Sequence, residues 1–362
     1  MRGKPTTQTS FVSLIDVEAL IASDHPIRRI KALVDEVLRG MDAHFEEMYV
    51  EGGRPSIPPE RLLKAKILQA LYTVRSDRQL CARLQTDLMF RWFIDLPLDQ
   101  TVFDASTFSQ NQERLLRHAI ADLFFAEVVS LAKQHGWISN DHFSVDGTLI
   151  QAWASIKSFK PKGTGKGPGA GNPWTDFKGE QRSNDTHAST TDPEAKLIKK
   201  GPGQEARLCF AGHATMENRN GLCVLFEVRS AIGEPEAEVA VDHAVELKNR
   251  GFRPKSIGAD KGYHTAGFVA GVREHGIIPH PALCDHRDPM GIQRSPAYTV
   301  SQRIRKRIEE IFGWTKTIGG FRKSRYRGVE RSHAASQYVV AALNLLRMAK
   351  LLVTDPPKLV RA

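Results

Sequence analysis

The chain has 362 residues, which exceeds one typical domain and is enough to bury a substantial core. Its apolar content of 41% and charged content of 25% are those of an ordinary soluble globular protein. The net charge of +10 is uneven, because residues 301–350 hold 12 Lys or Arg against 3 Asp or Glu. Such a stretch is expected of a surface that contacts phosphates, although a solvated basic surface has the same composition.

No segment of the chain is typical of secretion or of a membrane protein. The N-terminus lacks the apolar region of a signal peptide, and no uncharged apolar run of 18 residues occurs. We therefore expect a cytoplasmic, nucleoid-associated protein that does not contact a membrane. The cysteines show no C-x-x-C spacing and are expected to be reduced: Cys81, Cys209, Cys223 and Cys284.

Helical patterns dominate residues 11–135, which predicts an all-helical N-terminal domain over residues 1–135. Apolar side chains recur at helical spacing in 58–74, 76–96 and 104–136, and capping residues begin the last two. Short basic helices separated by capped turns are compatible with helix-turn-helix binding of DNA ends. A plain helical bundle has the same pattern.

The pattern changes near residue 140. Residues 142–150 alternate between apolar and polar side chains, which predicts a strand, and two more strands are predicted over 207–216 and 221–231. The later predicted elements are helices over 235–251, 264–276 and 336–353 and short strands over 255–260 and 277–279. This order predicts a mixed α/β core.

Residues 158–205 interrupt this pattern of elements. Between residues 160 and 173 the segment is rich in Gly, Pro and Lys, and it cannot bury enough apolar surface to offset the entropy of ordering. We therefore predict a flexible, protease-sensitive surface insertion that begins within reach of bound DNA.

Three acids stand out by their settings. Asp146 and Asp260 each end a short apolar segment with the pattern of a buried strand, and Glu309 lies on a basic helix. Ligands bind beyond the carboxyl ends of strands in such sheets. Three converging carboxylates can hold two divalent cations, which clamp the attacking and leaving oxygens in phosphoryl transfer. With the basic C-terminal region, this predicts a metal-dependent enzyme that acts on DNA.

Helical phase distinguishes the two neighbouring acids Glu309 and Glu310. At about 100° per residue, Arg305, Glu309 and Lys316 share one face, whereas the rival carboxylate Glu310 points away. An exposed Arg–Glu salt bridge, which contributes little stability, is the alternative interpretation of this face.

Five ordered blocks of sequence, VDGTLIQAWAS, SNDTHASTTDPEAKL, GHATMENRNGL, ADKGY and IEEIFGWTKTIG, resemble the DDE transposases of bacterial insertion sequences, specifically the insertion-sequence-five group. The resemblance runs from about residue 50 to about residue 350. It implies a ribonuclease-H-like catalytic domain over 136–353, followed by a tail over 354–362. It also implies two Mg²⁺ or Mn²⁺ ions held by a triad of Asp146, Asp260 and Glu309.

A second signature of that family is Tyr, two residues, Arg, three residues, Glu, six residues and Lys. Arg305, Glu309 and Lys316 match it in register, but Gln302 occupies the Tyr position. The family's reaction is cleavage at transposon ends, followed by attack of the freed 3′-hydroxyl on target DNA. The implied partners are terminal inverted repeats and target DNA, bound by a homodimer. A nuclease without strand transfer and a DNA-binding regulator are the alternative functions.

Several cations are predicted to contact DNA phosphates. Arg305 and Lys316 would do so beside the metals, and Arg suits bidentate contact. The loop 322–331 would add a second group, with Tyr326 among its arginines favouring nucleic acid, although a solvated loop is the alternative. The predicted contacts of this loop are Arg322, Lys323, Arg325 and Arg327.

Other residues within or near these blocks are interpreted as structural. Trp153 and Trp314 are expected to pack rather than to stack on bases. His187, His213 and Glu217 are not assigned as metal ligands.

Overall fold

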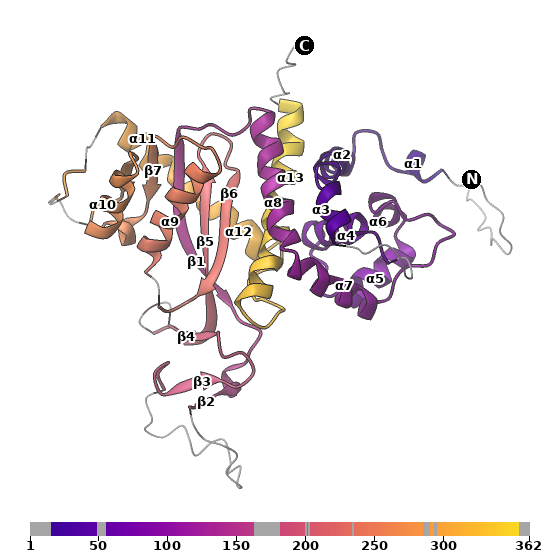
Figure 1. The fold of residues 1–362 in the computed structure, drawn as a ribbon, viewed down its shortest axis with the longest axis horizontal. Coiled ribbons are helices and arrows are strands. Elements are labelled where there is room, and N and C mark those ends of the chain that lie inside the picture. Colours follow the sequence, from indigo (N-terminus) through magenta and orange to yellow (C-terminus); the bar gives the residue numbers. More distant parts are fainter. Residues whose placement is uncertain are drawn as a thin grey trace, which may run out of the picture.

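The computed structural model describes residues 16–48, 56–162, 182–199, 201, 203–233, 235–284, 288, 290–292 and 295–354. Two regions lie next to each other, a group of N-terminal helices and a sheet flanked by helices (Figure 1). Helices α8 and α13 run side by side between them. Within the described part of the chain, every helix is too short or too polar to span a bilayer. All four cysteines have free thiols, and only that of Cys284 is exposed.

The N-terminal region is helical, as predicted. Its helices are α1 (Val17–Leu20), α2 (Pro26–Arg39), α3 (Asp42–Glu47), α4 (Pro59–Leu71), α5 (Asp77–Thr86), α6 (Leu88–Phe93), α7 (Ala105–Arg117) and α8 (Ile120–Gln134). Two of the predicted helices are each divided. Asp87 ends α5 in an extended conformation and caps α6, accepting the N–H of Phe90. Ala119 has a left-handed φ of 49° and separates α7 from α8.

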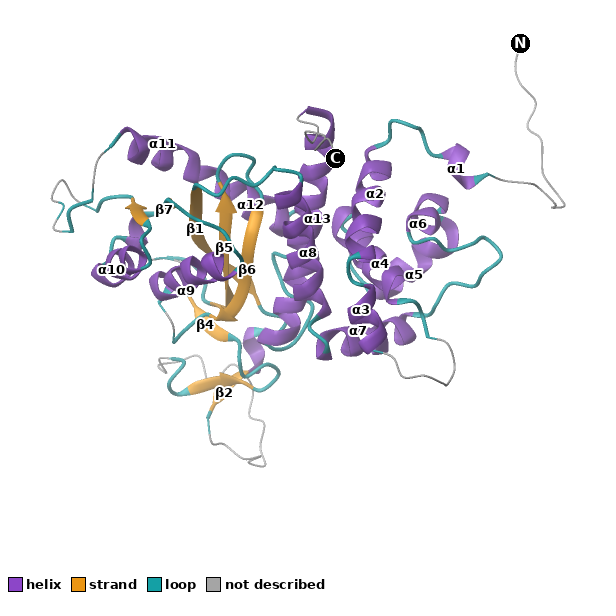
Figure 2. Ribbon diagram, turned by 45° about the horizontal axis from the view of Figure 1, so that its top comes forward, coloured by secondary structure: helices purple, strands orange, loops and turns teal. Residues whose placement is uncertain are grey.

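The sheet is mixed, which confirms the predicted fold class (Figure 2). Its strands are β1 (His142–Gln151), β4 (Lys196–Ile198), β5 (Arg207–Glu217), β6 (Cys223–Ser230), β7 (Ser256–Ala259) and β8 (Ile278–Pro281). Their order is β4-β5-β1-β7-β8, with β6 paired to β5. The central strand β1 is antiparallel to β5 and parallel to β7.

Helices cover both faces of this sheet. They are α9 (Glu236–Asn249), α10 (Ala266–Glu274), α11 (Pro296–Ile304), α12 (Ile308–Lys316) and α13 (Val329–Thr354), with 3₁₀ turns η1 (Ile156–Ser158), η3 (Lys261–Tyr263) and η4 (Arg305–Arg307). His243 of α9 bonds Thr215 on one face, and Lys316 of α12 bonds Thr148 on the other. Thr215 lies opposite Val145 in the β1–β5 register. Because side chains alternate along a strand, Thr215 and Thr148 point to opposite faces of the sheet.

Helix α13 connects the two regions. It packs against α2 and α4 on one side and against β6 on the other. Its polar side chains also cover the open edge of β6, where Asn344 bonds both backbone groups of Cys223 and Gln337 donates to Phe226 O at 2.7 Å. Helix α8, which lies inside the expected N-terminal domain of residues 1–135, packs against α13 and β6 as well.

The expectation of a coreless insertion over residues 158–205 is wrong for the described part of that segment. Strands β2 (Phe159–Pro161) and β3 (His187–Ser189) pair with each other, and β4 joins the main sheet. Buried Asp192 and neighbouring Glu194 accept the first N–H groups of the α13 end, at 3.0 and 2.6 Å. Local polar contacts therefore order residues that composition alone could not place. Most of the Gly- and Pro-rich stretch, from residue 163 to 181, lies outside the described residues.

Candidate active site

The first two acids lie at the same level of neighbouring strands. Strand β1 runs parallel to β7 with His142 opposite Ser256, and the same offset places Asp146 level with Asp260. Asp260 directly follows the end of β7, as predicted. Asp146, in contrast, does not end its strand. It lies in the middle of β1, because pairing with β5 continues after β7 has stopped.

Asp146 is half-buried among like charges. Burial raises the pKa of its carboxyl to about 6, and the charges of Asp260 and Glu236 raise it as well. The N–H of Gly147, which donates to Asp146 at 2.9 Å, and the charge of Arg305 oppose this rise. A half-buried carboxylate with two other acids nearby is a favourable place for a cation.

Asp260 is held by the turn that it begins. Its side chain accepts the N–H of Gly262 at 2.6 Å and caps η3. The next residue of the turn, Tyr263, is buried, and burial together with the nearby acids raises the pKa of its phenol. The turn therefore fixes the backbone of Asp260 at the carboxyl end of β7.

A further acid, Glu236, lies next to the backbone that follows Asp146 and was not predicted. It begins α9, and its carboxylate extends over Gly147 of β1, so that a Cβ added at Gly147 would lie 2.6 Å from its Oε1. Burial of the carboxylate against the strand and the charge of Asp260 raise the pKa of Glu236. No feature of its neighbours in the chain distinguishes this acid, because acids are common in the first turn of any helix.

Helix α12 brings the third predicted acid towards β1. Ile308 and Ile311 are buried, whereas Glu309 is exposed. At the other end of the helix, Lys316 donates to the hydroxyl of Thr148, which lies two residues after Asp146 on the same face of β1. Lys316 lies seven positions after Glu309, so the directions of the two side chains around the axis of α12 differ by only about 20°.

The helix is interrupted at Arg305, which corrects the phase calculation there. Residues Arg305–Arg307 form the 3₁₀ turn η4, in which each residue advances by about 120°. Arg305 nevertheless lies close enough to Asp146 to lower the pKa of that carboxyl. Its Nε donates to Gln302 at 2.7 Å, and Gln302 in turn donates to the carbonyl of His280 in β8. Gln302, which replaces the family's Tyr, therefore positions Arg305.

The rival acid Glu310 has a structural role. Its carboxylate lies 3.0 Å from Arg347 of α13 and 3.8 Å from Arg307. These ion pairs hold it away from Lys316, as the helical phase predicted. Glu310 therefore connects α12 to α13 and is not directed at the strand acids.

The acids are not gathered into one tight cluster. Among the described residues, no three Asp, Glu, His or Cys side chains are close enough together to hold a metal ion. Asp146, Asp260 and Glu236 influence one another electrostatically, and Glu309 lies on the neighbouring helix. The donor set still suits a hard cation, because carboxylate oxygens are the ligands that Mg²⁺ and Mn²⁺ prefer.

The basic loop 322–331 divides into two kinds of residue. Arg322, Lys323 and Arg327 are exposed. Arg325 is half-buried and donates to Val74 O at 2.8 Å, and the hydroxyl of Tyr326 lies 3.2 Å from Lys66. Arg325 and Tyr326 therefore attach the loop to the N-terminal helices. Their predicted contacts with nucleic acid stay predictions.

The expectation that Trp153 is a packing residue is wrong. Its side chain is 49% exposed, and Lys323 Nζ lies 5.4 Å from the centre of its ring. Trp153 and Lys323 line a hollow with Arg75 and Thr317, the residue after Lys316. Trp314, in contrast, is packed against the core as expected.

The other residues of the family-like blocks are structural, as interpreted. The carboxylate of Glu217 is fully buried and accepts the N–H groups of Arg219 and Asn220, at 2.9 and 2.8 Å, in the turn between β5 and β6. His187 is buried against Phe159. These contacts account for the two residues without a metal.

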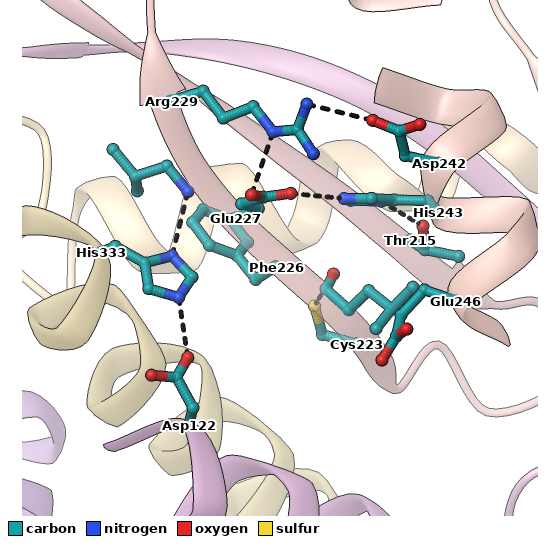
Figure 3. A network of polar contacts seen from close by, with 12 residues as sticks. Asp122, Thr215, Cys223, Phe226, Glu227, Arg229, Asp242, His243, Glu246 and His333 are labelled. Atoms are coloured by element: carbon teal, nitrogen blue, oxygen red, sulfur yellow. Dashed lines mark hydrogen bonds and ion pairs between the residues drawn. The ribbon is translucent and has the colours of Figure 1, made fainter. Parts of the chain in front are cut away.

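A second group of acids, on the α9 face of the sheet, has a partner for each charge (Figure 3). Glu227 of β6 lies 2.9 Å from Arg229 and 3.5 Å from His243, and Arg229 lies 3.1 Å from Asp242. Burial alone would raise the pKa of Glu227, but hydrogen bonds from His243 and Arg229 lower it to about 2. His243 also bonds Thr215 at 2.8 Å. This network is typical of a structural site.

Comparison with solved structures gives remote similarity. A piggyBac transposase synaptic complex with hairpin DNA is 11% identical, over 93% of this chain and 77% of that chain, with a TM-score of 0.42. A Mos1 transposase paired-end complex with a left transposon end is 10% identical, over 86% and 83%, with a TM-score of 0.22. None of the curated proteins matches the chain.

Two regions of the chain match known transposase families. Residues 15–114 match the Transposase domain (DUF772), which covers most of the N-terminal helices. Residues 174–345 match the Transposase DDE domain, which includes Asp260, Glu309 and most of the sheet. Asp146 lies between the two matched ranges. Together the two matches show that the chain belongs to the DDE transposases of insertion sequences.

Proposed function

We propose that this transposase cleaves the ends of its insertion sequence and transfers the 3′-hydroxyl ends into target DNA by two-metal-ion phosphoryl transfer. The observation that supports this most strongly is the placement of Asp146 level with Asp260, where β7 stops beside β1. This placement puts two carboxylates at a sheet edge that is open to a ligand.

Each acid of the triad has a distinct role in the proposal. Asp146 and Asp260 form the fixed part of the metal centre, and Glu309 completes it from α12. Two Mg²⁺ or Mn²⁺ ions bound there would activate the attacking oxygen and stabilise the leaving 3′-oxygen. The charge of Arg305 lowers the pKa of Asp146 and so favours the carboxylate form that a cation needs.

The path of the DNA follows from the cations beside this centre. Arg305 and Lys316 lie on either side of Glu309 along the helix and would contact phosphates next to the scissile bond. Thr317, the residue after Lys316, lines the same hollow as Trp153 and Lys323. The exposed indole of Trp153, next to Lys323, would stack on an unpaired base. Arg322 and Arg327 would add backbone contacts in the same loop.

The N-terminal helices are proposed to bind the terminal inverted repeats. A homodimer is proposed on DNA, because two transposon ends must be joined to one target.

Strand-transfer assays test this proposal against its alternatives. A transposon-end duplex with its 3′ end already cut, incubated with the protein, Mg²⁺ and plasmid, should be joined covalently to the plasmid. Cleavage of an uncut end without joining of the cut end would support a nuclease. Specific binding without either reaction, in both Mg²⁺ and Mn²⁺, would support a regulator.

A further inference from the structure

A hollow at the junction of the N-terminal helices and the catalytic region is lined by cations from both. Its walls are the turn after α4, the segment after β1, the end of α12 and the loop 322–331. Its volume is about 360 Å³, which lies in the range of about 300–1,000 Å³ for small-ligand sites. Within the described part of the chain, every charged side chain that lines it is a cation: Arg75, Lys323 and Arg325. Such a hollow suits an anion.

The turn that carries Arg75 is fixed to the catalytic region by two hydrogen bonds. Thr73 has a left-handed φ of 53°, which is uncommon for a β-branched residue, and its hydroxyl donates to Ile318 O at 2.7 Å. Arg325 donates to Val74 O at 2.8 Å. Strained residues persist where the surrounding contacts determine them, and they cluster at ligand-binding sites. These contacts therefore hold the turn in place beside the loop 322–331.

The backbone of Arg75 is fixed, whereas its side chain is available. The N–H of Arg75 donates to Gln79 Oε1 at 3.0 Å, and the N–H of Gln79 donates to Ser76, the cap of α5, at 3.1 Å. The guanidinium is exposed and has no ion-pair partner among the described residues. It can therefore bind a phosphate, for which its planar fork is suited, without losing another contact.

The catalytic region adds an aromatic ring and a second cation. Lys323 Nζ lies 5.4 Å from the centre of the Trp153 ring, which is 49% exposed. The segment that holds Lys323 pairs with the end of β1, where the N–H of Ser324 donates to Gln151 O at 2.7 Å. Gln151 lies five positions after Asp146, about 17 Å along an extended strand. The hollow is thus separate from the strand acids but fixed to the same strand.

We propose that Arg75 and Lys323 together bind a backbone phosphate of the transposon end, next to a base that stacks on Trp153. The hollow is then a nucleotide site shared by the N-terminal and catalytic regions. DNA that the N-terminal helices bind is thereby held in a fixed position relative to β1. This inference rests on the proposed function, because it takes the ligand to be the transposon end.

Neutral methylphosphonates, placed one at a time along a transposon end with an unpaired terminal strand, test this contact. Binding to the full-length protein is measured in EDTA by fluorescence anisotropy. In wild type, neutralising the contacted phosphate should weaken binding about tenfold. Arg75→Ala should weaken binding of the unmodified end by about as much and show no further loss at that phosphate. Lys323→Ala should lose its sensitivity at the same phosphate or an adjacent one.

Arg78→Ala is the matched control, because Arg78 is an exposed arginine on α5 that does not line the hollow. It should retain the full loss at the phosphate that Arg75 contacts. Arg75→Lys, which keeps the charge, should retain most of that loss as well. Unchanged melting temperatures of the variants exclude misfolding as the cause of any change.

Three results would overturn the inference. They are a wild type that is insensitive at every phosphate, an Arg75→Ala variant with the full wild-type pattern, and loss of sensitivity in Arg75→Ala and Lys323→Ala at phosphates that are not neighbours. Failure of the proposed function is distinguishable, because binding is measured without metal. A nuclease or a regulator would then show the expected pattern but would not join a cut end to plasmid.

Discussion

Two groups of half-buried acids on one sheet have opposite electrostatic settings. Glu227 on the α9 face lies among Arg229 and His243, and its pKa is lowered to about 2 (Figure 3). Asp146 on β1 lies among other acids, and its pKa is raised to about 6. Burial disfavours the charge of both carboxylates, so the partners decide the sign.

The charged neighbours of an acid distinguish the acids that hold the fold together from those that are available to a ligand. Acids with cationic partners, such as Glu227 and Glu310, connect elements of the fold. Asp146, whose charged neighbours are mainly acids, costs stability, and a bound cation would offset that cost. The same distinction applies to the cations, where Arg325 is engaged by the N-terminal helices and Arg322 is exposed.

The largest expected effect comes from the two neighbouring acids of α12. Glu309→Gln should lower DNA cleavage by about a thousandfold or more, as should Asp146→Asn and Asp260→Asn, because each removes a metal ligand. Binding to the transposon end should be retained in a gel-shift assay. Glu310→Gln should retain most of the cleavage. Loss of cleavage in Glu310→Gln but not in Glu309→Gln would show that the acids are assigned in the wrong order.

Stability should respond in opposite directions at the two groups of acids. In metal-free protein at pH 7, Glu227→Gln should lower the free energy of unfolding by about 1–2 kcal/mol, since Arg229 and His243 lose their negatively charged partner. Asp146→Asn should raise the melting temperature instead.

The pH dependence gives this prediction its control. The pKa of Glu227 is lowered from 4.5, so its contribution is complete above that value and is lost as pH falls towards 2. The pKa of Asp146 is raised from 3.8, so its cost is complete above about pH 6 and absent below about 4. Thermal melts of both variants between about pH 2 and pH 8 check this, and destabilisation by Asp146→Asn at pH 8 would contradict it.

Trp153 extends the comparison to an aromatic side chain. If its exposed indole stacks on a base, Trp153→Ala should weaken binding of a transposon end with an unpaired nucleotide by about tenfold. Trp153→Phe should retain most of the affinity, because a ring remains. Fluorescence anisotropy measures both, and equal losses in a fully paired duplex would argue against stacking.

The smallest expected effect concerns the basic loop. Changing Arg322, Lys323 and Arg327 together to Ala should reduce the slope of log affinity against log salt by about 2 to 3, one unit for each phosphate contact. Arg325→Ala should leave the slope unchanged and lower the melting temperature, because it removes the bond to Val74. An unchanged slope in the triple variant would place the phosphate contacts elsewhere, with the N-terminal helices the first candidate.

Local pattern predicted much of this arrangement. Alternation and apolar runs located the strands that carry Asp146 and Asp260, and helical period distinguished Glu309 from Glu310. These features depend on residues close together in the chain. The break at Arg305 was missed, since nothing in its neighbours distinguishes a 3₁₀ turn from an α-helix.

Contacts between distant segments were not predictable from the sequence. Glu236 meets Gly147 only because α9 crosses β1, and its own neighbours show an ordinary amphipathic helix. The burial of Arg325 and the exposure of Trp153 were not predicted for the same reason. The exposure of both side chains depends on how the loop packs against the N-terminal helices. Polar contacts of Asp192 likewise order a segment whose composition indicates none.

Iron-directed cleavage of the protein backbone tests most directly whether the acids without cationic partners form the metal centre. Fe²⁺ in place of Mg²⁺, with ascorbate and peroxide, generates hydroxyl radicals that cut the chain near the bound metal. The DNA-free protein should be cut near residues 146 and 260, and a transposon end should add cuts near 309. Excess Mg²⁺ should suppress all of them. Cuts concentrated near 227 and 243, or a pattern unchanged in Asp146→Asn, would contradict the account.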